Sequence, residues 1–153
     1  MTEPITRDEF SSRLVELCVN GRITGFPRRT RDLHILMKSV VLTFGAAAEY
    51  SEREVNEELR MWMADICPSF EIDHVTLRRR LIDEGYVERE RDGSKYWASV
   101  PPMESSLFEP DVESVDVYEA IGTGKKQVEQ RKEHYLRVRS LVDGRETDGQ
   151  DGT

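Results

Sequence analysis

The feature that most restricts the fold is a change of hydrophobic periodicity at Gly85. Before it, apolar residues recur every three to four positions in three successive segments, which is the spacing of amphipathic helices. After it, the pattern alternates, and Asp92 with Gly93 forms a dipeptide typical of tight hairpin turns. Tyr96 and Trp97 alternate on the returning strand, so we expect one to face the core. The sequence predicts three packed helices followed by a two-stranded hairpin.

The first two of these helices have clear stripes and boundaries. The first is predicted from Thr30 until Gly45, with its apolar stripe at Leu33, Leu36, Met37, Val40, Val41 and Phe44. The second begins after Ser51, because Ser51 and Glu54 match a capping box, and it ends before Pro68. Its stripe consists of Val55, Leu59, Trp62, Met63 and Ile66. Both helices are predicted to line the core.

The third helix carries three consecutive arginines. Asp73 is the predicted N-cap and Gly85 the predicted stop, with Leu77 and Leu81 on the inward face. Helical spacing turns Thr76, Arg79 and Asp83 away from the core and places Arg78 and Arg80 on the two flanks.

A leading helix is predicted in residues 1–25. Thr6 and Glu9 match a second capping box, and Asn20 with Gly21 is expected to end the helix in a left-handed conformation. The three-helix and hairpin region then occupies residues 26–100. A basic patch of Arg28, Arg29 and Arg31 lies at its start.

Beyond this region the composition changes. Residues 101–124 are acidic and are predicted to form a linker or a loosely packed arm. Residues 125–143 are charged, with one thin apolar stripe that cannot support an isolated helix, so this segment must pack on the domain, pair with a second copy or fray. A homodimer through this C-terminal helix is one expectation. Residues 144–153 are predicted to be disordered.

Composition narrows the possible functions. The net charge of −8 argues against general binding of polyanions, although local clusters can still form a positive face. Cys18 and Cys67 are too few for a disulfide framework, and the histidines lack ligand spacing, so we expect buried thiols, no metal and no cofactor. The sequence has no phosphate-binding loop, nucleophile elbow or zinc-protease motif, and no membrane-spanning run, which predicts a cytoplasmic protein that is not an enzyme.

Four stretches of the chain resemble a known family. They are "FPRR" at Phe26, "YSEREVNEEL" at Tyr50, "DHVTLRRRLIDEGYVER" at Asp73 and "DGSKYW" at Asp92. Together they resemble an uncharacterised bacterial domain of unknown function that often occurs behind helix-turn-helix domains of the arsenical-repressor type. The resemblance covers Phe26 to Trp97. It implies a winged-helix-like fold and a role in transcriptional regulation.

These observations predict a mainly α protein with a small β-wing, that is, an α+β winged helix-turn-helix with a leading helix and a C-terminal helical arm. We expect the third helix to be a recognition helix that turns Thr76 and Arg79 toward the bases of double-stranded DNA. The full predicted DNA-binding set is Arg28, Arg29, Arg31, Thr76, Arg78, Arg79, Arg80, Arg89, Arg91 and Lys95.

Two alternatives remain open at this point. The arginines can instead form ordinary surface salt bridges, such as Arg80 with Glu84 at i,i+4 spacing. The winged helix would then be a protein–protein interaction module that does not bind DNA. The acidic stretch from Ala98 onward, with 7 Lys and Arg against 12 Asp and Glu, could cover the basic helix and regulate it.

Overall fold

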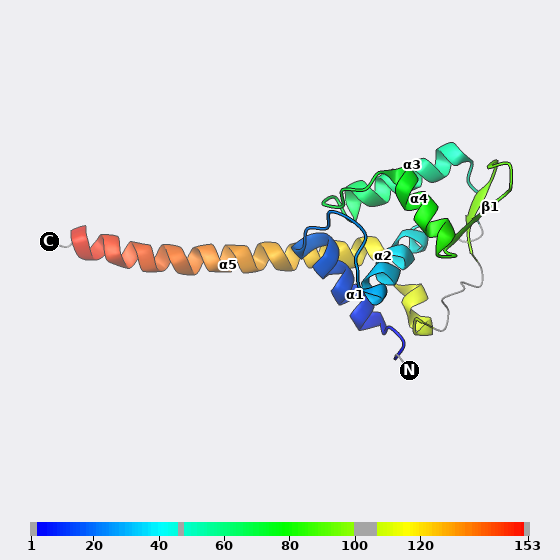
Figure 1. Ribbon diagram of the computed structural model, residues 1–153. Coiled ribbons are helices and arrows are strands. Elements are labelled where there is room, and N and C mark those ends of the chain that lie inside the picture. The colour runs from blue at the N-terminus through cyan, green and yellow to red at the C-terminus, as the bar shows by residue number, and fades with distance from the viewer. Residues whose placement is uncertain (1–2, 46–47, 100–106, 152–153) are drawn as a thin grey trace. The chain divides into compact units, whose positions relative to one another are not determined.

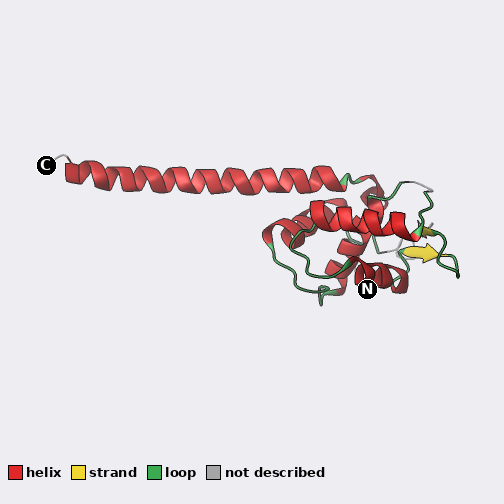
Figure 2. Ribbon diagram, turned by 90° about the horizontal axis from the view of Figure 1, so that it is seen from above, coloured by secondary structure: helices red, strands yellow, loops and turns green. Residues whose placement is uncertain are grey.

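The structure is a computed structural model that describes residues 3–45, 48–99 and 107–151, with side chains described as far as residue 142. The chain divides into two units, residues 1–121 and residues 122–153, and each is described by itself. In chain order the elements are α1 (Arg7–Val15), the π-helical turn η1 (Glu16–Asn20), α2 (Thr30–Leu42), α3 (Glu52–Asp65), α4 (His74–Asp83), β1 (Val87–Arg89), β2 (Tyr96–Ala98), the 3-10 turn η2 (Pro110–Ser114) and α5 (Val117–Asp151). The fold is mainly helical with one small antiparallel sheet, as predicted (Figures 1 and 2).

The core of the first unit is formed by the stripes predicted for α2, α3 and α4. The residues that carry these stripes and are fully shielded from solvent are Leu36, Met37, Val40, Val55, Leu59, Trp62, Ile66, Leu77 and Leu81. The indole N–H of Trp62 donates to Ser39 Oγ at 3.0 Å, and that hydroxyl donates to the Leu36 carbonyl at 2.7 Å. The buried polar atoms of the Trp62 and Ser39 side chains are therefore paired.

The predicted capping box of α3 is confirmed. Ser51 Oγ accepts from the Glu54 backbone N–H at 3.1 Å, and the Glu54 carboxylate accepts from the Ser51 backbone N–H at 2.9 Å. These bonds stabilise the ionised carboxylate and hold the pKa of Glu54 below its ordinary value, with the backbone bond to Ser51 the largest cause.

The predicted capping of α1 is half right. Thr6 Oγ1 accepts from the Glu9 N–H at 3.1 Å, but the Glu9 carboxylate binds Arg31 and does not return to the N-cap. The predicted left-handed stop is wrong, because Gly21 has φ −95°. A Cβ at Gly21 would lie 2.7 Å from the Glu16 carbonyl oxygen, so close approach is what requires glycine there. Cys18, at the end of this helix, is buried as expected.

The hairpin follows the predicted turn. Val87 pairs with Ala98, Glu88 with Trp97 and Arg89 with Tyr96 in antiparallel register. Gly93 has φ +74°, a conformation that favours glycine. Tyr96 is buried and Trp97 is partly exposed, in agreement with the alternation.

One strand-like contact was not predicted. The backbone N–H of Tyr50 donates to the Tyr96 carbonyl at 2.8 Å, and the N–H of Tyr96 donates back at 2.7 Å. Tyr50, which precedes the N-cap of α3, thus pairs with β2, so that β2 lies between Tyr50 and β1.

The predicted loose arm requires correction. Residues 100–106 lie outside the described residues, but residues 107–121 belong to the first unit, and Phe108, Val112, Val115, Val117 and Ile121 join its core. Phe108 packs edge-on against Phe10 of α1, with ring centroids 6.2 Å apart. The predicted boundary at residue 101 therefore does not separate a linker from a domain. The physical reason is that the apolar residues spaced among the acidic ones bury enough surface to hold this segment on the core.

The last helix also differs from the prediction. It begins at Val117, ahead of the predicted 125, and extends to Asp151, through residues expected to be disordered. Its start is fixed by Asp116, whose carboxylate accepts from the Glu119 backbone N–H at 3.1 Å, and by burial of Val117 and Ile121. Within the described residues, no helix is long and apolar enough to cross a membrane.

Candidate nucleic-acid interface

The local structure of α4 fixes which of its side chains face solvent. Asp73 caps the helix by accepting from the Thr76 N–H at 2.8 Å, and Gly85, with φ +82°, follows its end. The Thr76 backbone bond is the largest cause that lowers the pKa of Asp73. Because Leu77 and Leu81 are fully buried, the opposite face of α4 is exposed. That face carries Thr76, Arg79 and Asp83, as predicted.

Arg78 is occupied by contacts inside the first unit. Its guanidinium donates to Asn56 Oδ1 at 2.5 Å, pairs with Glu52 at 3.2 Å and lies over the Tyr96 ring, 5.5 Å from the centroid. Its side chain is only 12% exposed. Arg78 therefore joins α4 to α3 and β2.

Arg80 is also partly occupied. Its Nε donates to Glu84 at 3.1 Å, which confirms the predicted i,i+4 pair. Its guanidinium lies 5.1 Å from the centroid of the Phe26 ring. This contact places the flank of α4 beside the segment that precedes α2. Arg28 and Arg29 follow in that segment, and both are exposed.

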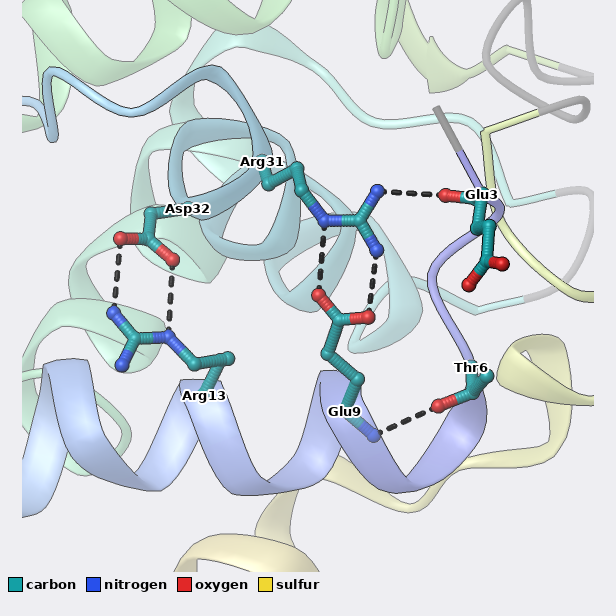
Figure 3. A network of polar contacts seen from close by, with 6 residues as sticks. All are labelled: Glu3, Thr6, Glu9, Arg13, Arg31 and Asp32. Atoms are coloured by element: carbon teal, nitrogen blue, oxygen red, sulfur yellow. Dashed lines mark hydrogen bonds and ion pairs between the residues drawn. The ribbon is translucent and has the colours of Figure 1, made fainter. Parts of the chain in front are cut away.

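Arg31 forms part of a polar seam between α1 and α2 (Figure 3). Its guanidinium binds both carboxylate oxygens of Glu9, at 2.9 and 2.6 Å, and donates to the Glu3 carbonyl at 2.7 Å. The bond to Glu9 is the largest cause that raises the pKa of Arg31. One turn along α1, Arg13 makes a second two-point contact with Asp32, at 3.1 and 2.9 Å. Arg31 is thus engaged in contacts within the protein, whereas its neighbours Arg28 and Arg29 are exposed.

Lys38 completes this set of paired cations. It is 3% exposed, its ammonium binds the Glu113 carboxylate, and it lies over the Phe108 ring at 5.6 Å from the centroid. Sequence reasoning did not find this pair, because 75 residues separate its members and neither has a local signal. The Asp32 pairing was missed for the same reason.

In the hairpin, two of the three predicted cations make no ion pair with any residue that the structure describes. Arg89 and Arg91 are exposed. Lys95 pairs with Glu49 at 3.2 Å, although both side chains are more than half exposed and the contact is weak for that reason. The Trp97 indole N–H donates to the Glu88 carboxylate at 3.2 Å. The partly exposed ring of Trp97 therefore has an acidic side chain next to it.

The predicted residues therefore divide into two groups. Arg31, Arg78, Arg80 and Lys95 make ion pairs within the protein. The others keep exposed side chains, and within the described part of the chain no ion pair or side-chain hydrogen bond engages their charged groups. We call the second group the open set, which consists of Arg28, Arg29, Thr76, Arg79, Arg89 and Arg91.

Among the described residues, no group of three or more His, Cys, Asp and Glu side chains is arranged to hold a metal ion. The class of protein defined by these observations is a small, mainly helical domain with an antiparallel hairpin and a partly open basic surface on its last core helix.

Comparison with known proteins gives the family. Residues 22–98 match the model of an uncharacterised protein family conserved in bacteria, DUF2087, and the chain belongs to this family. The match contains α2, α3, α4 and the hairpin, which agrees with the extent of the resemblance seen in the sequence. Searches of curated proteins and of solved structures gave no match.

Proposed function

We propose that this protein is a DNA-binding transcriptional regulator, or an accessory factor to one, in the cytoplasm. It would use a winged helix-turn-helix, with α4 as the recognition helix. The observation that carries the proposal is the selective exposure on α4. Arg78 and Arg80 are engaged by neighbours, whereas Thr76 and Arg79 on the outermost face are left open.

The order of elements supports this reading. The chain runs from α2 through the Tyr50 bridge to α3, α4 and the β1–β2 hairpin. In a winged helix, a short strand before the second helix pairs with the hairpin, and the third helix enters the major groove. The Tyr50–Tyr96 pairing corresponds to that short strand.

The side chains of the open set suit distinct DNA contacts. A guanidinium such as that of Arg79 can bind guanine O6 and N7 at two points, and the methyl group of Thr76 can contact thymine. Arg89 and Arg91 on the hairpin, with Arg28 and Arg29 on the loop beside α4, would contact flanking phosphates. Contacts of the last kind fix position and carry no sequence information.

The test is binding of the full chain to a fluorescently labelled mixed-sequence duplex over a salt series. We expect affinity to fall steeply as salt rises. A plot of the logarithm of the binding constant against the logarithm of the salt concentration should have a slope of about −0.9 for each phosphate contacted. On such a duplex, where base-specific contacts average out, Arg79→Ala should weaken binding and reduce the salt slope by about 0.9, the share of one phosphate contact. Arg7→Ala removes an exposed cation from α1 and is the matched control. Absence of binding at low salt would overturn the proposal.

A specific observation favours a second candidate, a winged-helix module that binds another protein. The first unit carries 15 Lys and Arg against 24 Asp and Glu, a net charge of −9. Such a unit repels nucleic acid at long range, so DNA contact depends on the local cluster alone. If the duplex does not bind at low salt, this second candidate becomes the better account of the open set.

A further inference from the structure

The distal part of α5 presents an apolar stripe to solvent. Tyr135, Val138 and Val142 lie three and four residues apart, hence on one side of the helix, and they are 61%, 46% and 50% exposed. Val128, seven residues before Tyr135, continues the stripe toward the start of the second unit. A single helix with one thin stripe gains too little from its own hydrogen bonds to be stable alone in water. The stripe therefore requires a covering surface.

The charges of this segment are separated along its length. Residues 122–133 contain four Lys and Arg against two Glu, a net charge of +2, and residues 140–151 contain four Asp and Glu against one Arg, a net charge of −3. The residues between them include Arg137 and Arg139. The segment therefore begins basic and ends acidic, and the exposed apolar residues Tyr135 and Val138 lie at its middle.

This pattern makes the segment complementary to itself. A symmetric dimer uses the same surface on both copies, so the two halves of that surface must match each other. In an antiparallel pair with full overlap, the acidic end of each helix lies against the basic start of the other, and Tyr135 of one copy packs against Val138 of the other. In a parallel pair, each end would meet an end of the same charge, and Arg131 would meet its own copy within the stripe. The arginines at the middle face their own copies in both arrangements and do not distinguish them.

We infer that two copies of this chain associate through an antiparallel pair of α5 helices, formed by residues 122–151 of each copy. Complementary charge selects a second α5 as the occupant of the stripe and fixes the antiparallel direction. This direction also places the positive end of each helix dipole beside the negative end of the other. The inference gives the expected homodimer a specific geometry, and it does not depend on DNA binding.

The geometry is tested by pulsed electron paramagnetic resonance on the full chain with one spin label per copy. Cys18 and Cys67 are buried, so a single introduced cysteine takes the label. With Arg137→Cys the two labels should lie within about 25 Å of each other, because the axes of paired helices are about 8–10 Å apart. With Thr123→Cys they should lie roughly 40 Å apart, from the 1.5 Å rise per residue of a helix. Short distances at both positions would mean a parallel pair, and a long distance at position 137 would mean that something other than α5 covers the stripe. Either result would overturn the inference.

Sedimentation equilibrium of the full chain tests the role of charge. We expect a dimer that weakens as salt rises, because screening reduces the attraction between opposite charges. Lys125→Glu/Lys126→Glu reverses the charge of the basic start and should weaken the dimer by about tenfold, the scale of a few exposed ion pairs. In a parallel pair the same double variant would relieve repulsion and strengthen the dimer, which would contradict the antiparallel arrangement.

Arg7→Glu/Arg53→Glu is the matched control, since it makes the same change of charge at two exposed arginines of the first unit. It should leave the dimer intact. Val138→Asp places a charge at the middle of the stripe and should give a monomer. The fluorescence of Trp62 and Trp97 shows whether the first unit of each variant keeps its fold. A wild-type chain that is monomeric at all concentrations in low salt would overturn the inference, and so would a Val138→Asp variant that dimerises as the wild type does.

Discussion

The seam between α1 and α2 and the outer face of α4 both contain arginines, and they use them in different ways. In the seam, Arg13 and Arg31 each make two-point contacts with a carboxylate. On α4, Arg79 extends from the helix with no such contact to any described residue. The difference teaches that a run of cations in the sequence gives no information on their roles until the burial of each neighbouring residue is known.

The physical basis of the difference is desolvation. A cation that loses water on folding must be paired, because an uncompensated buried charge costs several kcal/mol. Lys38 meets this requirement through Glu113, although the two lie in distant parts of the sequence. An exposed cation such as Arg79 keeps its water and contributes little to stability, so its charge is available for a ligand.

The largest effect is expected for Glu113→Ala, which removes the partner of Lys38. We expect a loss of about 2–3 kcal/mol in the free energy of unfolding, below the full value for a buried pair because Glu113 is 57% exposed. Urea denaturation measures this loss. The double variant Lys38→Met/Glu113→Ala should recover most of it, since no buried charge remains. A loss below about 0.5 kcal/mol would mean that Lys38 needs its partner no more than an exposed surface cation does, which would contradict this account.

The next effect concerns the seam itself. Arg31→Ala should lower the free energy of unfolding by about 1–2 kcal/mol, because it removes charge-assisted bonds to Glu9 and the Glu3 carbonyl. Arg31→Lys should recover only a small part, since an ammonium cannot reproduce the planar two-point contact. Full recovery by lysine in urea denaturation would mean that charge alone, and not the geometry in Figure 3, stabilises the seam.

A smaller effect separates two neighbours on α4. Arg78→Ala should cost about 1 kcal/mol, because it breaks the contacts to Asn56 and Glu52. Arg79→Ala should stay within about 0.5 kcal/mol of the wild type. Thermal denaturation of both variants makes the comparison. Equal losses at the two positions would contradict the distinction between occupied and open arginines.

The smallest effect is expected on how the free energy of unfolding depends on pH under acidic conditions. The pKa of Asp73 is lowered in the folded state, so the unfolded chain binds the proton more readily. Stability from this cap is therefore present above the unfolded pKa of about 3.9 and is lost as the pH falls through the lower folded value. Asp73→Asn keeps an acceptor for the Thr76 N–H and does not titrate. Urea midpoints between about pH 2 and 5 should depend less on pH in this variant.

Much of the fold was predictable because its signals are local. The Ser51 capping box, the Gly85 stop and the turn at Gly93 each depend on residues within a few positions, and each is confirmed. The same reasoning predicted the outward face of α4, because Leu77 and Leu81 fix its orientation.

What could not be predicted depends on long-range pairing. The sequence places Arg31 beside Arg28 and Arg29, and only the packing of α1 reveals that Glu9 binds Arg31. Residues 107–121 were wrongly predicted to be loosely packed, because the prediction relied on their acidic composition and gave no weight to Phe108 and Val112, which are buried in the core. One signal was available and was not used, namely the spacing of Asp116 and Glu119 at the start of α5.

The most direct test of the central claim measures Arg79→Ala and Arg31→Ala side by side, for duplex binding at low salt and for urea denaturation. We predict that Arg79→Ala loses DNA affinity and keeps its stability. Arg31→Ala should lose stability and keep its DNA affinity at a temperature where it is folded. If Arg79→Ala binds DNA as the wild type does, or if both variants lose the same affinity, the division into occupied and open arginines does not explain the function of this surface.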